Sequence, residues 1–189
     1  MKKYTDDEIK KAILDAENDL PKYEEIIKLF NDNSVDVSTD MNFQRKFNNF
    51  FSMVKRSKNY YTAYYSFFKF LRDNTDIFSN VLEIFYKKIH RVEASFISKM
   101  LHVIDNNLPI YDKNVLHILE IERPKIWWIA KRKIEKASEI YNQLIQWYKD
   151  FELSSDGQKW ISFFNEKYPK TNISSTKKID FILWRLGAG

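Results

Sequence analysis

One carboxylate in the sequence stands where a catalytic group could be held. Asp112 follows residues 105–109, a run of turn-forming residues that ends in Pro109, and it precedes a segment with helical periodicity. Proline biases the residue before it toward extended backbone, and an aspartate at this place is a typical helix N-cap. A carboxylate positioned in this way can deprotonate a water molecule or stabilise nearby positive charge. The position of Asp112 alone favours a structural N-cap, and catalysis by its carboxylate is the less common alternative.

Basic residues are the second group that could have a functional role, as contacts to an anionic partner. The chain carries a formal charge of +5 and has an isoelectric point near 9.1, which favours an anionic partner such as nucleic acid. A basic run between residues 123 and 136 is either a solvated face or a surface that neutralises phosphates, and the second alternative predicts that binding falls steeply with salt. The candidate DNA contacts are Lys87, Lys88, Arg91, Lys99, Lys113 and Asn114.

Aromatic side chains make up 16% of the chain. Most of them recur at helical spacing and are expected in the core, because Phe and Tyr bury large areas. Adjacent residues on a helix cannot both face inward. One member of the pair Tyr60–Tyr61 and one member of the pair Trp127–Trp128 should therefore be partly exposed. Exposed rings can stack on a nucleic-acid base. The candidates for such a base pocket are Tyr60, Tyr61, Tyr64, Trp127 and Trp128.

The composition excludes several common chemistries. Without cysteine, the chain has no disulfide, thiolate zinc site, cysteine-ligated iron–sulfur cluster or cysteine nucleophile. Its three glycines, two of them among the last three residues, do not supply a phosphate-binding loop or a dinucleotide fingerprint. Its histidines, His90, His102 and His117, are far apart in sequence and have no carboxylate at ligand spacing. We therefore expect neither a metal site nor a cofactor.

The elements that must position these residues are helices. Apolar residues recur at steps of three and four through most of the chain, and no longer sequence repeat is present. We predict a single all-α domain over residues 1–189, a compact bundle of about nine or ten helices. A two-lobed arrangement with a cleft between the lobes is an open alternative.

Prolines and cap residues set the predicted helix boundaries. Pro21 is predicted to end the first helix. A long helix is predicted to start just after Pro124, and Asp156 is predicted to cap the helix that follows it. Gly187 is the predicted C-cap of the last helix.

One stretch resembles a known family. A packed helix, a loop with proline and a second helix that opens with Asp-x-x-Val follow one another in Ala94-Ser95-Phe96-Ile97-Ser98-Lys99-Met100-Leu101-His102, Asn107-Leu108-Pro109-Ile110-Tyr111 and Asp112-Lys113-Asn114-Val115. This arrangement is similar to the core of the helix-hairpin-helix DNA glycosylases of base-excision repair, and residues 178–187 are similar to the closing helix of that fold. The resemblance implies that Asp112 faces the extruded nucleotide and is the catalytic carboxylate.

The chain departs from that family at two places. Members carry a Gly-x-Gly hairpin before the packed helix, whereas residues 89–93 contain no glycine. Members that also cut the strand carry a lysine at a set distance before the aspartate, and here that position is Glu93 or Ala94. Lys99 lies about one and a half helical turns further along, so we expect it to face elsewhere and to contact a phosphate. The resemblance then implies a monofunctional enzyme, which leaves an abasic site in an intact strand.

These observations lead to three hypotheses. The first is a monofunctional DNA glycosylase that flips out and excises a modified base. Relatives of similar architecture include bacterial defence enzymes that remove hypermodified bases, such as glucosylated hydroxymethylcytosine, from phage DNA. The second is a non-catalytic nucleic-acid-binding protein with a glycosylase-like fold, and the third is an interaction module of a defence or toxin system.

The start of the chain bears on where the protein acts. Acidic residues follow directly after the first few positions, where a signal peptide would need an apolar stretch, and no later apolar run reaches the length of a membrane span. We therefore expect a cytoplasmic protein that does not bind membranes. We also expect it to be a monomer, and its charge and the family resemblance indicate DNA as its partner.

Overall fold

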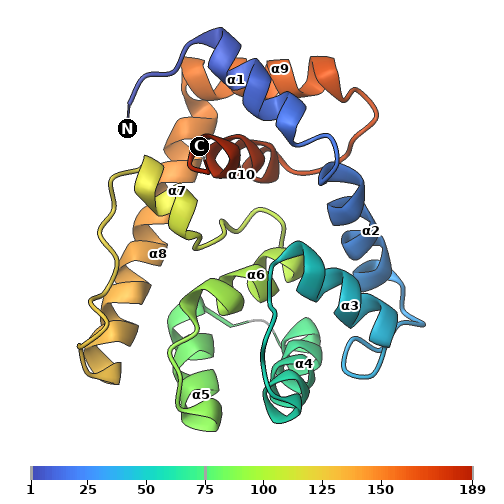
Figure 1. Ribbon diagram of the computed structural model, residues 1–189, viewed down its shortest axis with the longest axis vertical. Coiled ribbons are helices and arrows are strands. Elements are labelled where there is room, and N and C mark those ends of the chain that lie inside the picture. Colours follow the sequence, from blue (N-terminus) through green and yellow to red (C-terminus); the bar gives the residue numbers. More distant parts are fainter. Residues whose placement is uncertain (1, 75, 189) are drawn as a thin grey trace.

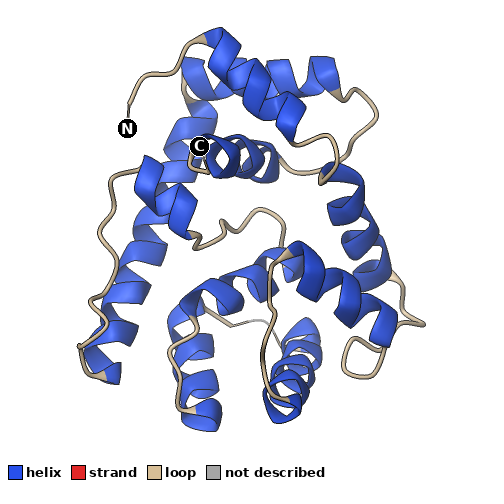
Figure 2. Cartoon of the chain, in the orientation of Figure 1, coloured by secondary structure: helices blue, strands red, loops and turns tan. Residues whose placement is uncertain are grey.

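The computed structural model describes residues 2–74 and 76–188. Within these ranges every regular element is a helix and no strand is present, as Figure 2 shows. The predicted all-α class and the predicted number of helices are thereby confirmed. The ten helices of the described ranges are α1 (Asp6–Asp15), α2 (Leu20–Asn31), α3 (Met41–Phe50), α4 (Lys58–Asp73), α5 (Phe78–Ile89), α6 (Ala94–Ile104), α7 (Lys113–Ile118), α8 (Ala130–Leu153), α9 (Ser155–Lys167) and α10 (Ser175–Leu186).

Side-chain caps explain where several helices begin. At α1, the N–H of Thr5 donates to Glu8 Oε2 at 2.7 Å, and the N–H of Glu8 donates to Thr5 Oγ1 at 3.3 Å. At α10, Ser174 Oγ accepts a hydrogen bond from the N–H of Lys177 at 3.1 Å. Each of these bonds satisfies an amide that has no partner inside its helix.

The start of α8 differs from the prediction. The helix begins at Ala130 rather than directly after Pro124. A turn comes first, in which the N–H of Trp128 donates to the Lys125 carbonyl at 3.2 Å. The backbone hydrogen bonds of α8 therefore start only after this turn, and the Trp127–Trp128 pair lies outside the helix.

Two further boundary predictions are wrong for local reasons. Pro21 lies in the first turn of α2 instead of ending the first helix. Proline is tolerated there because an amide in the first turn has no helical acceptor. Ser154, not Asp156, caps α9, since Ser154 Oγ accepts from the N–H of Gly157 at 3.0 Å.

The helices form two groups, which can be followed in Figure 1. In the first group, α10 packs on α1, α7, α8 and α9. In the second group, α2 packs on α3, and α4, α5 and α6 pack on one another. α5 also packs on α8 and so joins the two groups. The loop between α6 and α7 carries the chain from the second group to the first, and it delivers Asp112.

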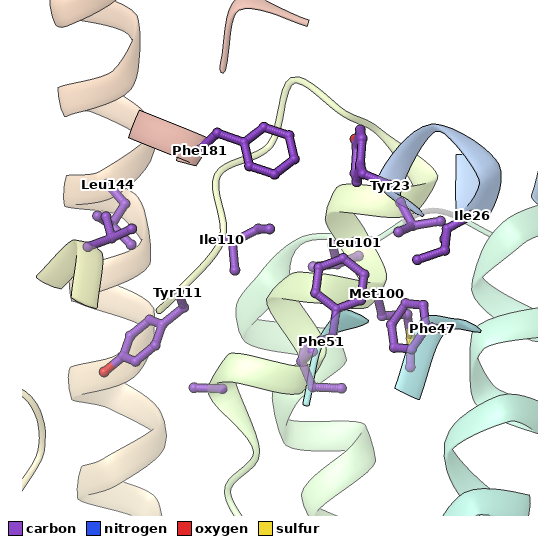
Figure 3. Close-up of a cluster of buried hydrophobic side chains, with 14 of the residues drawn as sticks. Tyr23, Ile26, Phe47, Phe51, Met100, Leu101, Ile110, Tyr111, Leu144 and Phe181 are labelled. Carbon is purple, nitrogen blue, oxygen red and sulfur yellow. The ribbon is translucent and has the colours of Figure 1, made fainter. Parts of the chain in front are cut away.

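The core around α6 is apolar and rich in aromatic rings. Figure 3 shows Met100 and Leu101 of α6 beside Phe47 and Phe51, and the rings of Phe47 and Phe51 are 4.6 Å apart. All four side chains are buried. Burying such side chains stabilises each position by roughly 1.5–3 kcal/mol relative to exposure. This packing fixes the direction of α6 and thereby the direction of its polar residues.

Candidate functional site

A cavity of about 870 Å³ lies between the two groups of helices. Its lining comes from the α2, α3 and α6 regions on one side and from α7 and α10 on the other. The aromatic residues in the lining are Phe50, Phe51, Phe96, Tyr111, Phe181 and Trp184. Six basic and four acidic residues give the lining a formal charge of +2; they are Lys22, Lys46, Lys99, Lys113, Arg123 and Lys177 against Asp19, Glu25, Asp112 and Asp180. Flat apolar faces and a positive charge favour a ligand with aromatic and anionic parts.

Asp112 is the N-cap of α7 and at the same time lines this cavity. One carboxylate oxygen, Oδ1, accepts a hydrogen bond from the N–H of Asn114 at 2.8 Å. The other oxygen, Oδ2, lies 4.0 Å from the Nζ of Lys99. The capping role and a role in the cavity therefore use different oxygens of the same carboxylate and do not exclude each other.

Residues 105–112, which we call the Asp112 loop, are hydrogen-bonded to the neighbouring helices. The N–H of Tyr111 donates to Ser98 Oγ of α6 at 2.8 Å. The hydroxyl of Tyr141 in α8 donates to the Pro109 carbonyl at 3.1 Å. Because its backbone groups are bonded to two different helices, the loop holds Asp112 in a defined place.

A fully buried histidine of α6 holds the same loop. His102 Nδ1 lies 2.6 Å from the Leu108 carbonyl, which can only accept, so Nδ1 carries the proton. Nε2 is then the acceptor for the Tyr23 hydroxyl at 2.9 Å. Burial lowers the pKa of His102 to about 3, so the ring is neutral at physiological pH. Both ring nitrogens are used in these contacts, and His102 is a structural residue.

Lys99 lies next to Asp112, contrary to the expectation that it faces elsewhere on its helix. Its Nζ donates to the Phe51 carbonyl at 3.3 Å and approaches Asp112 Oδ2. Burial lowers the pKa of its ammonium group, and the nearby carboxylates of Asp112 and Asp180 oppose this shift. The face of α6 that lines the cavity carries residues 95, 96 and 99, whereas residue 94 is buried elsewhere. The prediction placed Lys99 by its distance along the helix from residue 94, and because residue 94 does not face the cavity, it assigned Lys99 to the wrong face of α6.

A second buried ion pair in the cavity wall had not been expected. In α10, Lys177 Nζ donates to Asp180 Oδ2 at 2.7 Å, and both side chains are almost fully buried. The Tyr148 hydroxyl lies 3.4 Å from Asp180 Oδ1. The ammonium of Lys177 also lies 4.3 Å from the ring centre of Phe181. The spacing of lysine and aspartate at three residues was visible in the sequence, but nothing in it showed that the pair is buried.

The predicted DNA contacts fall into two places. Lys99, Lys113 and Asn114 line the cavity together with Asp112. Lys87, Lys88 and Arg91 do not line it; they lie at the end of α5 and in the turn that follows. Lys87 there pairs with Glu83 at 2.9 Å, and Arg91 pairs with Glu93 at 3.0 Å. The structure thus brings half of this predicted set to the cavity.

The three tyrosines predicted for a base pocket are not part of the cavity lining. Tyr60 and Tyr64 are buried in the core, and the Tyr64 hydroxyl donates to the Phe96 carbonyl at 2.7 Å. Tyr61 is half-buried, and its hydroxyl donates to the Met53 carbonyl at 2.8 Å. The expected difference in exposure within the Tyr60–Tyr61 pair is present. These rings stabilise α4 against its neighbours, so the structure offers them no access to a ligand in this cavity.

The two tryptophans also lie outside the cavity lining, for a different reason. Trp127 is 79% exposed, while Trp128 is half-buried and has the guanidinium of Arg132 over its ring at 3.9 Å. The expected difference in exposure within the Trp127–Trp128 pair is therefore present, but Trp127 faces solvent and neither ring lines the cavity.

The connection between α5 and α6, residues 90–93, contains no glycine. His90 ends α5 with a φ of 56°, in the left-handed region, and its N–H donates to the Tyr86 carbonyl at 2.7 Å. Glycine adopts this conformation without the steric cost of a Cβ atom. α5 and α6 nevertheless pack on each other, so the turn forms with a strained residue at this position.

Comparisons of the chain with protein-family models, with curated proteins and with solved structures found no match. Across residues 2–74 and 76–188, no helix has the length and apolar character needed to cross a membrane. In the same part of the chain, His, Asp and Glu side chains form no group of three that could hold a metal ion.

Proposed function

We propose that this protein is a monofunctional DNA glycosylase that flips a modified base out of DNA and hydrolyses its N-glycosidic bond. The position of Asp112 carries the proposal. Its Oδ1 is bonded to the backbone of α7, whereas its Oδ2 is left to face Lys99 in the wall of the cavity. A fixed carboxylate with one available oxygen is what this hydrolysis requires.

The rest of the lining suits a flipped nucleotide. The rings of Tyr111, Phe181 and Trp184 provide surfaces on which a base can stack, and the positive charge of the lining suits its phosphates. The cavity volume of about 870 Å³ lies within the range of small-molecule pockets and leaves room for a base enlarged by modification. A glucosylated hydroxymethylcytosine of phage DNA is the substrate that the family resemblance suggests.

The reaction assigns one role to Asp112. The bond between the base nitrogen and C1′ of the deoxyribose breaks, and the base leaves with the bonding electron pair. Positive charge builds on the sugar, and the carboxylate next to it stabilises this transition state. Water then bonds to C1′ and gives a proton to Asp112, while the departing base takes up a proton from solvent. The product is an abasic site in an unbroken strand.

Lys99 acts in this scheme as a positioning residue. Its ammonium, anchored on the Phe51 carbonyl, attracts Oδ2 of Asp112 and holds the carboxylate in the wall of the cavity. Because the amine lies this close to the proposed reaction centre, strand breaks must be scored both with and without alkali. A monofunctional enzyme gives breaks only after alkali.

The experiment compares three DNA samples: plain duplex, duplex with common lesions, and phage DNA with glucosylated cytosines. Each is incubated with the wild-type protein, and strand breaks are scored both with and without alkali treatment. We expect breaks in one modified sample and none in plain DNA. Absence of breaks in all three would contradict the proposal.

Matched variants assign any activity to Asp112. Asp112→Asn keeps an oxygen for the N-cap of α7 but removes the charge, so base release should be lost while the fold and DNA binding remain. Asp105→Asn is the control, because Asp105 lies in the same loop, is exposed and does not line the cavity. Equal activity in the wild type and in Asp112→Asn would contradict the assignment.

A second candidate function is non-catalytic nucleic-acid binding by the same fold. The hydrogen bond from the Asn114 N–H to Asp112 favours it, since this bond alone gives the aspartate a structural role. Under this alternative, DNA binding is salt-sensitive and no DNA sample is cut. In either case we propose a cytoplasmic monomer that acts on DNA.

A further inference from the structure

Residues 123–129, which we call the α8 tip, expose an unusual set of side chains. Ile126, Trp127 and Ile129 are 88%, 79% and 72% exposed. Large apolar side chains that gather at neighbouring positions in solvent are typical of an interaction site. These residues lie just before α8, at the end of that helix that points away from α9 in Figure 1.

The surroundings of the α8 tip are basic. Arg123 precedes these apolar residues, and Lys131 and Arg132 follow them on the first turn of α8, all three exposed. Lys125 of the tip pairs with Glu122, which directly precedes the tip, but the acidic residues nearby are fewer than the basic ones. Apolar side chains among cations favour a partner that is itself anionic and offers flat apolar surfaces.

The α8 tip is continuous with the cavity. Arg123 belongs to the cavity lining, and Trp127 follows it after four residues. Four residues of extended chain span at most about 14 Å. A nucleic acid strand advances by about 3.4 Å per nucleotide, so Trp127 lies within reach of roughly four nucleotides from the cavity rim.

We propose that the α8 tip is a second nucleic-acid contact, in which Trp127 stacks on an unpaired base that flanks the nucleotide in the cavity. The neighbouring cations neutralise phosphates on either side of that base. The inference rests on the proposed function only in taking nucleic acid as the ligand of the cavity. A strand that enters the cavity passes Arg123 and meets the tip next.

The experiment measures binding and needs no catalysis. Fluorescence anisotropy is recorded with labelled single-stranded DNA and labelled duplex for the wild type and for Trp127→Ala. Stacking of one base is worth about 1–3 kcal/mol, so we expect single-stranded DNA to bind about tenfold more weakly to the variant. Trp127→Phe, which keeps a ring, should restore most of the affinity.

Leu153→Ala is the matched control. Leu153 is equally exposed, at 83%, but lies at the opposite end of α8. Its substitution should leave binding unchanged. A flank shorter than about four nucleotides should also abolish the difference between wild type and Trp127→Ala, because the base that stacks is then missing.

Two results would overturn the inference. One is equal affinity of the wild type and Trp127→Ala for single-stranded DNA. The other is binding to phosphatidylserine vesicles that is lost in Trp127→Ala while DNA binding is unchanged, since the tip would then be a membrane contact. Failure of the proposed function is separate: DNA binding that depends on Trp127, with no base release from any DNA, would contradict the glycosylase and leave the tip as assigned.

Discussion

Two loops of this protein each contain one proline and each lead into a helix, yet they present opposite chemistry. The Asp112 loop, with Pro109, is bonded to side chains of α6 and α8 and turns a carboxylate toward a cavity. The α8 tip, with Pro124, turns isoleucines and a tryptophan into solvent. A catalytic group must be held at a fixed place, whereas a contact with a flexible strand can adapt. This difference fits the roles that we propose for the two loops, chemistry for the Asp112 loop and binding for the α8 tip.

The largest expected effect concerns the buried histidine that holds the Asp112 loop. Burial lowers the pKa of His102 to about 3 in the folded protein, from 6.5 when unfolded. Between these values the unfolded chain binds the additional proton, so stability falls as pH falls below 6.5. From pH 7 to pH 5 this group should cost about 2 kcal/mol of the free energy of unfolding.

Urea unfolding of the wild type and of His102→Gln at both pH values checks this prediction. The variant cannot take up that proton, so its loss of stability between the two pH values should be smaller by about 2 kcal/mol. Parallel pH dependence in the two proteins would mean that His102 is not held neutral in the fold.

The next effect concerns the close approach of α10 to α7. A Cβ atom at Gly187 would lie 2.5 Å from the Asn114 carbonyl oxygen, which is backbone and cannot swing away. Gly187→Val should therefore destabilise the protein by about 1–3 kcal/mol and disturb the start of α7, where Asp112 sits. Thermal unfolding measures the loss. Ala188→Val, at the exposed neighbouring position, should change little.

A smaller effect is expected where α8 holds the Asp112 loop. Tyr141→Phe removes the hydrogen bond to the Pro109 carbonyl and leaves that buried acceptor without its donor. We expect a loss of about 1 kcal/mol in stability and a measurable loss of base release. Tyr168→Phe removes a comparable bond, to the Ile13 carbonyl far from the loop, and should spare base release. Equal loss of activity in both variants would show that the bond to Pro109 has no special role.

The smallest effect on stability is expected at the α8 tip. Trp127 is mostly exposed, so Trp127→Ala should change the free energy of unfolding by no more than about 0.5 kcal/mol. Urea unfolding is the measurement. A loss of several kcal/mol would place the tip among the structural elements of the fold and remove its contrast with the Asp112 loop.

The sequence predicted the all-α class and the number of helices because apolar periodicity is a local signal, whereas the boundaries predicted at Pro21, Pro124 and Asp156 are wrong. Thr5 with Glu8 and Ser174 with Lys177 act as caps within three residues of each other, so no distant contact decides them. The start of α8 was misplaced, because a turn that precedes a helix carries no apolar period of its own.

The site was predicted only in part, since a cavity is made by residues far apart in the chain. Asp112 could be named from its loop, but its neighbour Lys99 was assigned to another face by counting along one helix. The tyrosines of α4 show why the spacing of aromatic rings cannot distinguish a pocket from a core. Tyr64 follows the helical spacing of its neighbours, and this spacing would be the same if its ring lined a pocket. The sequence did not show that the ion pair of Lys177 and Asp180 is buried, because its burial depends on how α10 packs beside the cavity.

The most direct test of the account is base release by Asp112→Asn on the DNA that the wild type attacks, with binding measured in parallel. The account predicts a loss of activity of about a thousandfold, within the range for a catalytic acid or base, and unchanged affinity for DNA. Activity that survives in Asp112→Asn, in a protein that binds as tightly as the wild type, would contradict the central claim that this carboxylate performs the reaction.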